Sequence, residues 1–224
     1  MTLHHKTPKH FEHYVNSVNN FDIDECVNYL IANSRFAMSK KYSLNQGKNQ
    51  SQRKDFDMKC KSIGRVAVMP RDYHLSLSVV DIVKNIKALE QYKPVKEVSY
   101  KAASNLNIEL DIPLVSADNN KAIIVKVCDD AGKGFERKII NNKFYCEAEI
   151  VRRSMHPEAN IFIMAIERDA PHATAIYKIS DELLELAEQE NSSKIEMIND
   201  CVINNHYPTY FDGNAKIINK PNYL

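Results

Sequence analysis

Long hydrophobic runs are missing from this sequence. The longest apolar stretches, such as residues 122–125 and 161–166, fall far below the roughly 20 residues that a membrane-spanning helix needs. The N-terminus carries histidine and lysine within residues 4–10 and lacks the apolar stretch of a secretory signal. We therefore expect a cytoplasmic protein without membrane contact.

Paired cysteine motifs are also missing. The five cysteines form no CxxC pair, and their odd number argues against a closed disulfide framework. We interpret them as reduced thiols, which suits the expected cytoplasmic location. They are Cys26, Cys60, Cys128, Cys146 and Cys201.

A strong net charge is absent as well, because the formal charge is only +1. The distribution is uneven: residues 1–155 carry 25 basic against 18 acidic groups, and residues 156–224 carry 5 against 11. A polyanion would therefore be met by the earlier part of the chain, where basic residues are densest in 35–65. The alternative is an ordinary solvated loop. The candidate DNA contacts are Lys40, Lys41, Arg53, Lys54 and Arg65.

The composition is that of a globular protein, with 44% hydrophobic and 26% charged residues in 224. This length favours one domain over residues 1–224. Apolar residues at spacings of three and four predict helices over 9–42 and 75–91. A polar stretch separates them, and we expect a mobile basic loop over residues 40–65.

From residue 96 onward the pattern changes to short β-prone runs, which mark a second part of the domain over residues 96–224. Together with a helical N-terminal third over residues 1–95, the pattern predicts an α+β fold with a mixed sheet flanked by helices. The predicted strands are 97–100, 107–113, 121–128, 160–167 and 172–179, and the predicted helices of this part are 135–154 and 181–204.

Two segments near the C-terminus carry a family resemblance. Residues 161–187 run from Ile-Phe-Ile-Met-Ala-Ile-Glu-Arg-Asp-Ala-Pro to Leu-Leu-Glu-Leu-Ala, and residues 205–210 read Asn-His-Tyr-Pro-Thr-Tyr. They resemble the closing strands, final helix and Trp-Pro-Xaa-Tyr-type motif of the RecE-type exonucleases, the exonuclease VIII family. The resemblance extends over about residues 62–211. It implies the PD-(D/E)XK nuclease fold and Mg²⁺-dependent 5′–3′ digestion of double-stranded DNA ends.

The same resemblance implies a set of site residues. Asp111 matches the strand that delivers the first metal-binding aspartate, Lys126 matches the lysine of the next strand, and Glu147 stands where the family's helix has a glutamine. Glu97 matches a strand start and is the candidate second ligand. The implied catalytic set is thus Lys126, Asp111 and Glu147, with Asp111 and Glu97 as ligands of Mg²⁺.

Departures from the family pattern fall on the metal ligands. Ile124 stands two residues before Lys126, where the family has an aspartate, and Val68 stands where it has a histidine. Side chains two apart on a strand share a face, so an apolar group replaces a ligand beside Lys126. We expect a degenerate site that binds Mg²⁺ weakly or no metal at all. An alternative is a structural ion pair between Asp111 and Lys126.

Three functions remain open at this point. The first is a phage or mobile-element protein that binds DNA ends in recombination but is catalytically impaired, with a homo-oligomeric ring and a single-strand annealing partner implied by the resemblance. The second is a repurposed fold that inhibits or adapts a host nuclease or defence complex through its acidic last helix. The third is an active exonuclease with displaced ligands. The acids of that helix include Glu182, Glu185, Glu188 and Glu190.

Overall fold

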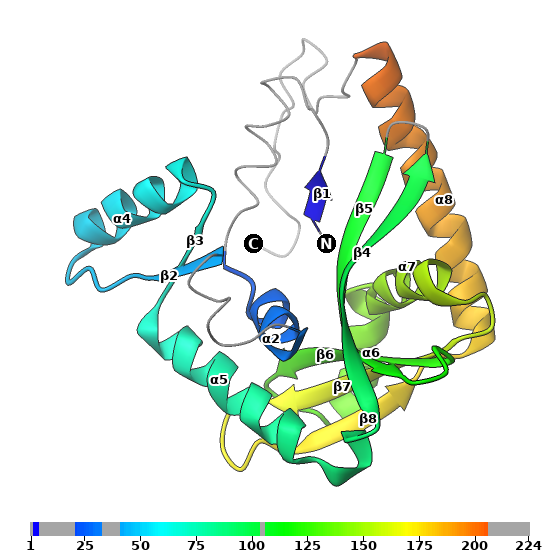
Figure 1. The fold of residues 1–224 in the computed structure, drawn as a ribbon, viewed down its shortest axis with the longest axis horizontal. Helices are drawn as coiled ribbons and strands as arrows, with labels where there is room; N and C mark the ends of the chain where they lie inside the picture. The colour runs from blue at the N-terminus through cyan, green and yellow to red at the C-terminus, as the bar shows by residue number, and fades with distance from the viewer. Residues whose placement is uncertain (1, 5–20, 33–40, 104–105, 206–224) are drawn as a thin grey trace, which may run out of the picture.

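The computed structural model describes residues 2–4, 21–32, 41–103 and 106–205 (Figure 1). In these residues a six-stranded sheet has the order β1-β5-β6-β7-β8, with β4 paired to β5. Strands β6 and β7 are parallel over their whole length, and the other pairs are antiparallel, so the sheet is mixed as predicted. The strands are β1 Thr2–His4, β4 Tyr92–Ala103, β5 Leu106–Ser116, β6 Lys121–Cys128, β7 Asn160–Glu167 and β8 Thr174–Lys178.

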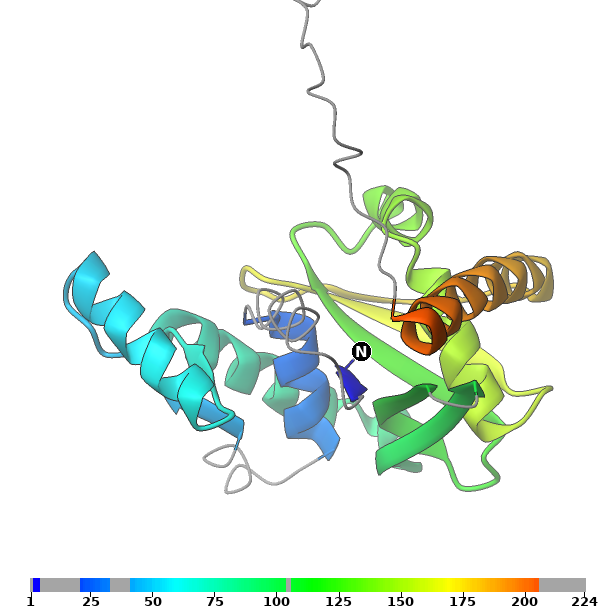
Figure 2. The ribbon, with the colours of Figure 1, turned by 90° about the horizontal axis from the view of Figure 1, so that it is seen from above.

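Helices cover both faces of the sheet (Figure 2). Helices α6, α7 and α8 share one apolar core with Ile124 and Ile163, whereas α2 and α5 share the other with Ile123 and Val125. Burial on both sides explains why β6 and β7 read as continuous apolar runs rather than alternating ones. The helices are α2 Ile23–Ala32, α4 Gln50–Ser62, α5 Pro70–Asn85, the 3-10 helix η1 Lys87–Leu89, α6 Lys133–Asn141, α7 Phe144–Met155 and α8 Asp181–Asn204.

The prediction of a mobile loop over residues 40–65 is wrong. The chain there forms β2 (Tyr42–Leu44), α4 and β3 (Val66–Val68), and β2 and β3 pair in parallel as a separate two-stranded sheet. Asn49 caps α4 by accepting from the amide of Gln52, and Cys60 is buried against the rest of this segment. The cap and the buried contacts of this segment thus help to order a sequence that is otherwise polar.

The helix predicted over residues 135–154 is interrupted. Lys143 has a left-handed φ of 54° and divides the segment into α6 and α7. A left-handed residue ends one helix because its amide can no longer continue the i to i−4 pattern. The last helix begins and ends as predicted, since Ser180 accepts from the amide of Leu183 at its N-terminus.

Helix α8 is fastened to α7 by a buried polar network. Glu149 is 1% exposed and pairs with Arg153 one turn later, and its second oxygen accepts from Asn191 Nδ2 at 2.6 Å. Arg153 also donates to the Ser192 hydroxyl at 3.2 Å. A buried carboxylate with this many donors is a satisfied structural group rather than a reactive one.

No helix that the structure describes combines the length and the apolar character required to cross a membrane. This finding agrees with the absence of long hydrophobic runs in the sequence.

We predict that Arg153→Met destabilises the fold by about 3–5 kcal/mol, because it leaves the Glu149 carboxylate buried without its cation. The matched control is Arg152→Met, since Arg152 lies 3.6 Å from the largely exposed Asp181 and should contribute less than about 1 kcal/mol. Urea unfolding at neutral pH measures both free energies. Equal losses in the two variants would contradict the assigned role of Glu149.

Candidate functional site

Lys126 is the buried cation at the centre of the candidate site. It lies on β6, two residues after Ile124, and its side chain is only 9% exposed. Its ammonium group lies 4.9 Å from the centre of the Phe144 ring at the start of α7. A buried ammonium requires nearby negative charge, because its loss of hydration would otherwise cost several kcal/mol.

Glu147 supplies the nearer negative charge. Its Oε2 atom lies 2.6 Å from Lys126 Nζ, a short charge-assisted contact between α7 and β6. Glu147 occupies the first turn of α7, where the helix dipole favours an acid. The structure therefore brings together two of the three residues expected from the sequence to form a catalytic set.

Asp24 supplies the second carboxylate, and the sequence analysis did not identify it. It lies on α2, with Oδ2 3.7 Å from Lys126 Nζ and Oδ1 accepting from the amide of Val127 at 2.7 Å. More than a hundred residues separate Asp24 from Lys126, and no local pattern links such distant positions. The available signal was an acid and an asparagine, Asp24 and Asn28, spaced four apart on a helix that also carries Val27, Leu30 and Ile31.

The position of Asp24 follows from an incomplete strand pairing. Strand β5 pairs with β6 only at Leu114↔Ile123 and Val115↔Ala122, which leaves later backbone groups of β6 without a strand partner on that side. Asn28 bonds both the amide and the carbonyl of Val125, at 3.2 Å and 3.1 Å. With Asp24 bonding the Val127 amide, α2 takes the place of a strand along this edge.

Burial and charge act in opposite directions on this cluster. Burial raises the pKa of Asp24 to about 6, although the nearby Lys126 ammonium lowers it in part. For Lys126, burial alone would lower the pKa, but the charges of Glu147 and Asp24 outweigh it and raise the pKa above that of an ordinary lysine. Lys126 is therefore a cation at neutral pH and is paired within the protein.

Ile124 and Val68 are both core residues. Ile124 is 2% exposed and packs in the same apolar core as Ala148 and Ile163, while Val68 is 1% exposed in the core on the other face. Neither position offers a polar atom to the surroundings of Lys126. The structure thus agrees with the sequence analysis that β6 carries no acid beside its lysine.

Comparison with known proteins identifies this fold. A family profile described as a PDDEXK-like domain of unknown function (DUF3799) matches residues 139–221. The structure is also similar to a crystal structure of a "putative exonuclease" from Eubacterium rectale, with a TM-score of 0.51, 14% identity, and coverage of 90% of this chain and 77% of that one. This chain has a PD-(D/E)XK nuclease-like fold. A search of curated proteins found no match.

The resemblance proposed from residues 161–187 is therefore confirmed at the level of the fold, and so is the predicted mixed sheet flanked by helices. At 14% identity, the similarity to a solved structure shows the fold alone and does not carry an activity to this chain.

Nuclease-like folds of this kind imply a Mg²⁺ site, and the described side chains include no cluster of ligands for one. Glu97 and Asp111 belong to β4 and β5, but their side chains lie outside the described part of the structure. Where side chains are described, no three His, Cys, Asp or Glu gather to hold a metal. The two carboxylates near β6 already have an ammonium between them, whereas Mg²⁺ requires free oxygen ligands.

The predicted DNA contacts that the structure describes differ in their surroundings. Lys40 lies outside the described residues. Lys41 pairs with Glu25 at 2.8 Å, and Arg53 donates through Nε to the carbonyl of Gly47 at 2.9 Å, so both have internal partners. Lys54 is exposed on α4, and Arg65 is half-buried.

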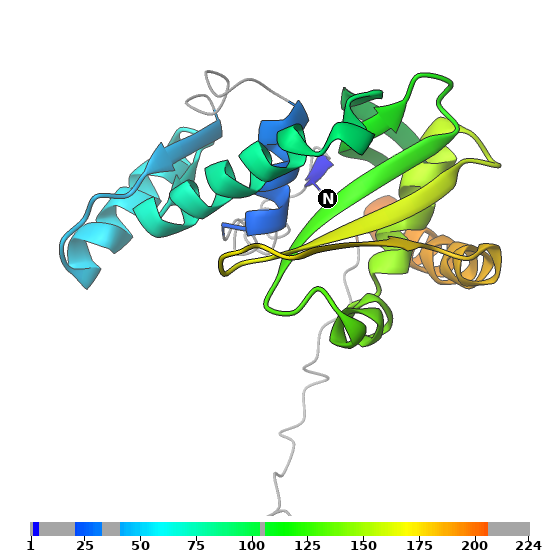
Figure 3. The same cartoon turned by 90° about the horizontal axis from the view of Figure 1, so that it is seen from below.

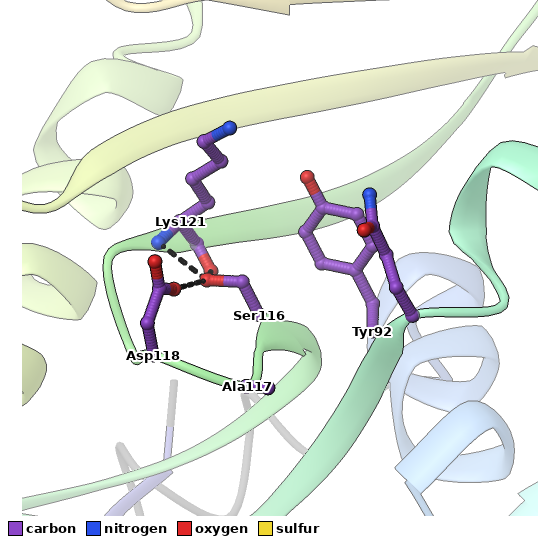
Figure 4. Close-up of a pocket in the computed structure, with 6 residues that line it drawn as sticks. Tyr92, Ser116, Ala117, Asp118 and Lys121 are labelled. Atoms are coloured by element: carbon purple, nitrogen blue, oxygen red, sulfur yellow. Dashed lines mark hydrogen bonds between the residues drawn. The ribbon is translucent and has the colours of Figure 1, made fainter.

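A shallow pocket lies at the turn between β5 and β6 (Figure 4). The Ser116 hydroxyl donates to Asp118 Oδ1 at 2.6 Å and accepts from the Lys121 amide at 2.9 Å, and Tyr92 forms the facing wall. This bond to Ser116 lowers the pKa of Asp118. The polar groups thus close the turn, and the pocket contains none of the candidate site residues.

We predict that Asp24 makes the stability of the fold depend on pH. The folded protein holds the Asp24 proton up to about pH 6, whereas the unfolded chain releases it near 3.8, so stability falls as pH rises through this window and is level above it. The loss approaches about 3 kcal/mol for a shift of this size. Asp24→Asn keeps an acceptor for the Val127 amide and should remove this fall.

Urea unfolding of wild type and Asp24→Asn at pH 4, 5, 6 and 7.5 measures the effect. The control is Glu25→Gln, on the next residue of α2, whose partner is Lys41. The difference in free energy of unfolding between wild type and Asp24→Asn should change with pH. The difference between wild type and Glu25→Gln should not show the same change. If the free energy of unfolding depended on pH in the same way for all three proteins, ionisation of Asp24 would not destabilise the fold, and the prediction would be wrong.

Proposed function

We propose that this chain is a nuclease-fold protein of a phage or mobile element that binds duplex DNA ends in recombination and hydrolyses them poorly or not at all. The observation that supports impairment is the state of Lys126, whose ammonium is buried between Glu147 Oε2 at 2.6 Å and Asp24 Oδ2 at 3.7 Å. A phosphate that needs this cation would have to displace two carboxylates from it. The internal ion pairs thus compete directly with substrate.

The donor set around Lys126 supports the same proposal. Phosphodiester hydrolysis by bound metal requires oxygen ligands that activate water and stabilise the charge on the leaving oxygen. Ile124 places a buried hydrocarbon beside the lysine, where the family has a metal-binding aspartate. No cluster of metal ligands among the described side chains takes the place of that aspartate. In this proposal Mg²⁺ contributes little to what the protein does.

Binding of duplex DNA is supported by the fold and by charge. Basic residues outnumber acidic ones in residues 1–155, and the segment with the highest density forms an ordered helix, α4, rather than a loop. A positive surface attracts the phosphate backbone irrespective of sequence. A cytoplasmic homo-oligomer working with a single-strand annealing protein belongs to the same proposal and follows from the family resemblance.

The adaptor alternative receives less support from the acidic helix α8. Glu190 accepts from Lys143 at 2.5 Å and from the Tyr145 hydroxyl at 3.0 Å, and Glu188 lies 3.7 Å from Arg153. These two acids hold α8 on the protein. The other acids of α8 are exposed, and they are Asp181, Glu182, Glu185, Glu196 and Asp200.

We predict that the purified protein digests end-labelled linear duplex DNA no faster than its Glu147→Gln variant in either Mg²⁺ or Mn²⁺, while binding the same DNA. Glu147→Gln is nearly isosteric and keeps an oxygen beside Lys126, and Asp24 still supplies a negative charge to the ammonium. Lys121→Ala is the control, because Lys121 is an exposed lysine at the start of the same strand.

Two measurements are made on each protein: product release from the labelled end, and fluorescence anisotropy of the duplex between 50 and 200 mM salt. Binding should weaken by about a hundredfold over this range if about four phosphates are contacted. Metal-dependent digestion by wild type and Lys121→Ala that is lost in Glu147→Gln would establish an active exonuclease. Absence of DNA binding at 50 mM salt would contradict the proposal altogether.

A further inference from the structure

Helix α4 lies at the end of an arm formed by residues 41–68, which comprises β2, α4 and β3. The arm projects from the sheet on the side opposite α8 (Figure 3). Within it α4 packs against β3, with Cys60 buried and Phe56 half-buried on its inner side. The outer side of α4 is exposed to solvent.

The arm is fixed to the rest of the molecule. At its base, Tyr42 and Val68 are buried in the same apolar core as Leu30 of α2. At its turn, Asn45 accepts from the Gly47 amide at 3.1 Å and donates to the Arg53 carbonyl at 3.1 Å. A side chain at Gly47 would meet the Arg53 amide at 2.8 Å, so this close turn requires glycine. The orientation of α4 is therefore built into the fold.

The charge of the arm is strongly positive. Residues 48–65 contain six basic side chains and two acidic ones. On α4 itself, Lys54 and Lys59 are exposed and have no ion-pair partner among the described residues, whereas Lys61 shares its charge with Asp57 at 3.1 Å. A rigid helix thus presents free ammonium groups to solvent.

An exposed methionine lies among these charges. Met58 is 61% exposed, and Lys54 and Lys61 lie four residues before and three residues after it, which places all three on one face of the helix. Ile63, just past the end of α4, is 64% exposed. A surface with lysines around an exposed methionine is complementary to a polyanion in which rows of negative charge lie beside a less polar groove.

We propose that the outer face of α4 is the surface that contacts duplex DNA, with Lys54 and Lys59 on phosphates and Met58 covered by the groove. This inference rests on the proposed DNA-binding function and specifies where the DNA lies. The major groove admits an α-helix. A helix of 13 residues, about 20 Å long, is long enough to follow it. The positive charge of the arm matches the phosphate backbone.

Methionine oxidation tests the contact on the unmodified protein. Hydrogen peroxide converts an exposed methionine to its sulfoxide, and mass spectrometry of the peptides reads the extent at each position. Met197 on α8, which is 53% exposed, is the internal control. Saturating duplex DNA should slow oxidation of Met58 at least fivefold and leave Met197 unchanged.

A pair of matched variants tests the lysines. Lys54→Gln with Lys59→Gln removes two charges from α4, and Lys84→Gln with Lys87→Gln removes two from exposed positions near the end of α5. The α4 pair should weaken DNA binding about tenfold and reduce the slope of log affinity against log salt by about 2, since each phosphate contact contributes about 0.9. The control pair should bind nearly as wild type does.

The outcomes separate this inference from the proposed function. If wild type binds no duplex DNA, both are wrong. If wild type binds, but Met58 stays fully reactive and the α4 pair binds equally well, the proposed function stands and the assignment to α4 is wrong. Protection of Met58 that depends on protein concentration without DNA would identify this face as a contact between copies of the chain and would also overturn the assignment.

Discussion

The burial of one ammonium group, Lys126, constrains the whole arrangement of this protein. A cation on an inner strand is tolerated only with negative charge around it, and here that charge comes from Glu147 on α7 and Asp24 on α2. Helix α7 lies over one face of the sheet, and α2 lies over the other. The ion pairs therefore connect the N-terminal segment, the sheet and the C-terminal helices at a single point.

Helix α2 is held in position by its hydrogen bonds to the edge of β6, next to Lys126. Because β5 diverges from β6 after two pairs, the free edge of β6 needs hydrogen-bond partners, and Asn28 and Asp24 provide them one helical turn apart. Asp24 therefore has two roles, closing a strand edge with one oxygen and neutralising Lys126 with the other. In the proposed function, Lys126 is the lysine of the nuclease fold, held in a structural ion pair.

The sequence predicted the core of the fold well and the N-terminal part poorly, for identifiable reasons. Strands β6 and β7 are continuous apolar runs, and α8 has a capping serine, so their boundaries are encoded locally. The arm was predicted as a loop because its order depends on a side-chain turn at Asn45 and on packing with α2, which no local pattern reveals. Lys126 and Glu147 were found through a family resemblance, whereas Asp24 became visible only when the tertiary structure brought α2 to β6.

The most direct test of this account is the titration of the Lys126 ammonium, followed by NMR on protein labelled with ¹⁵N-lysine, with and without duplex DNA. The account predicts that Lys126 titrates at a higher pH than an ordinary lysine and that its signal is unchanged when DNA is added. A Lys126 that titrates at a lower pH than an ordinary lysine, or whose signal shifts on binding DNA, would contradict it, because the ammonium would then be free to meet a phosphate.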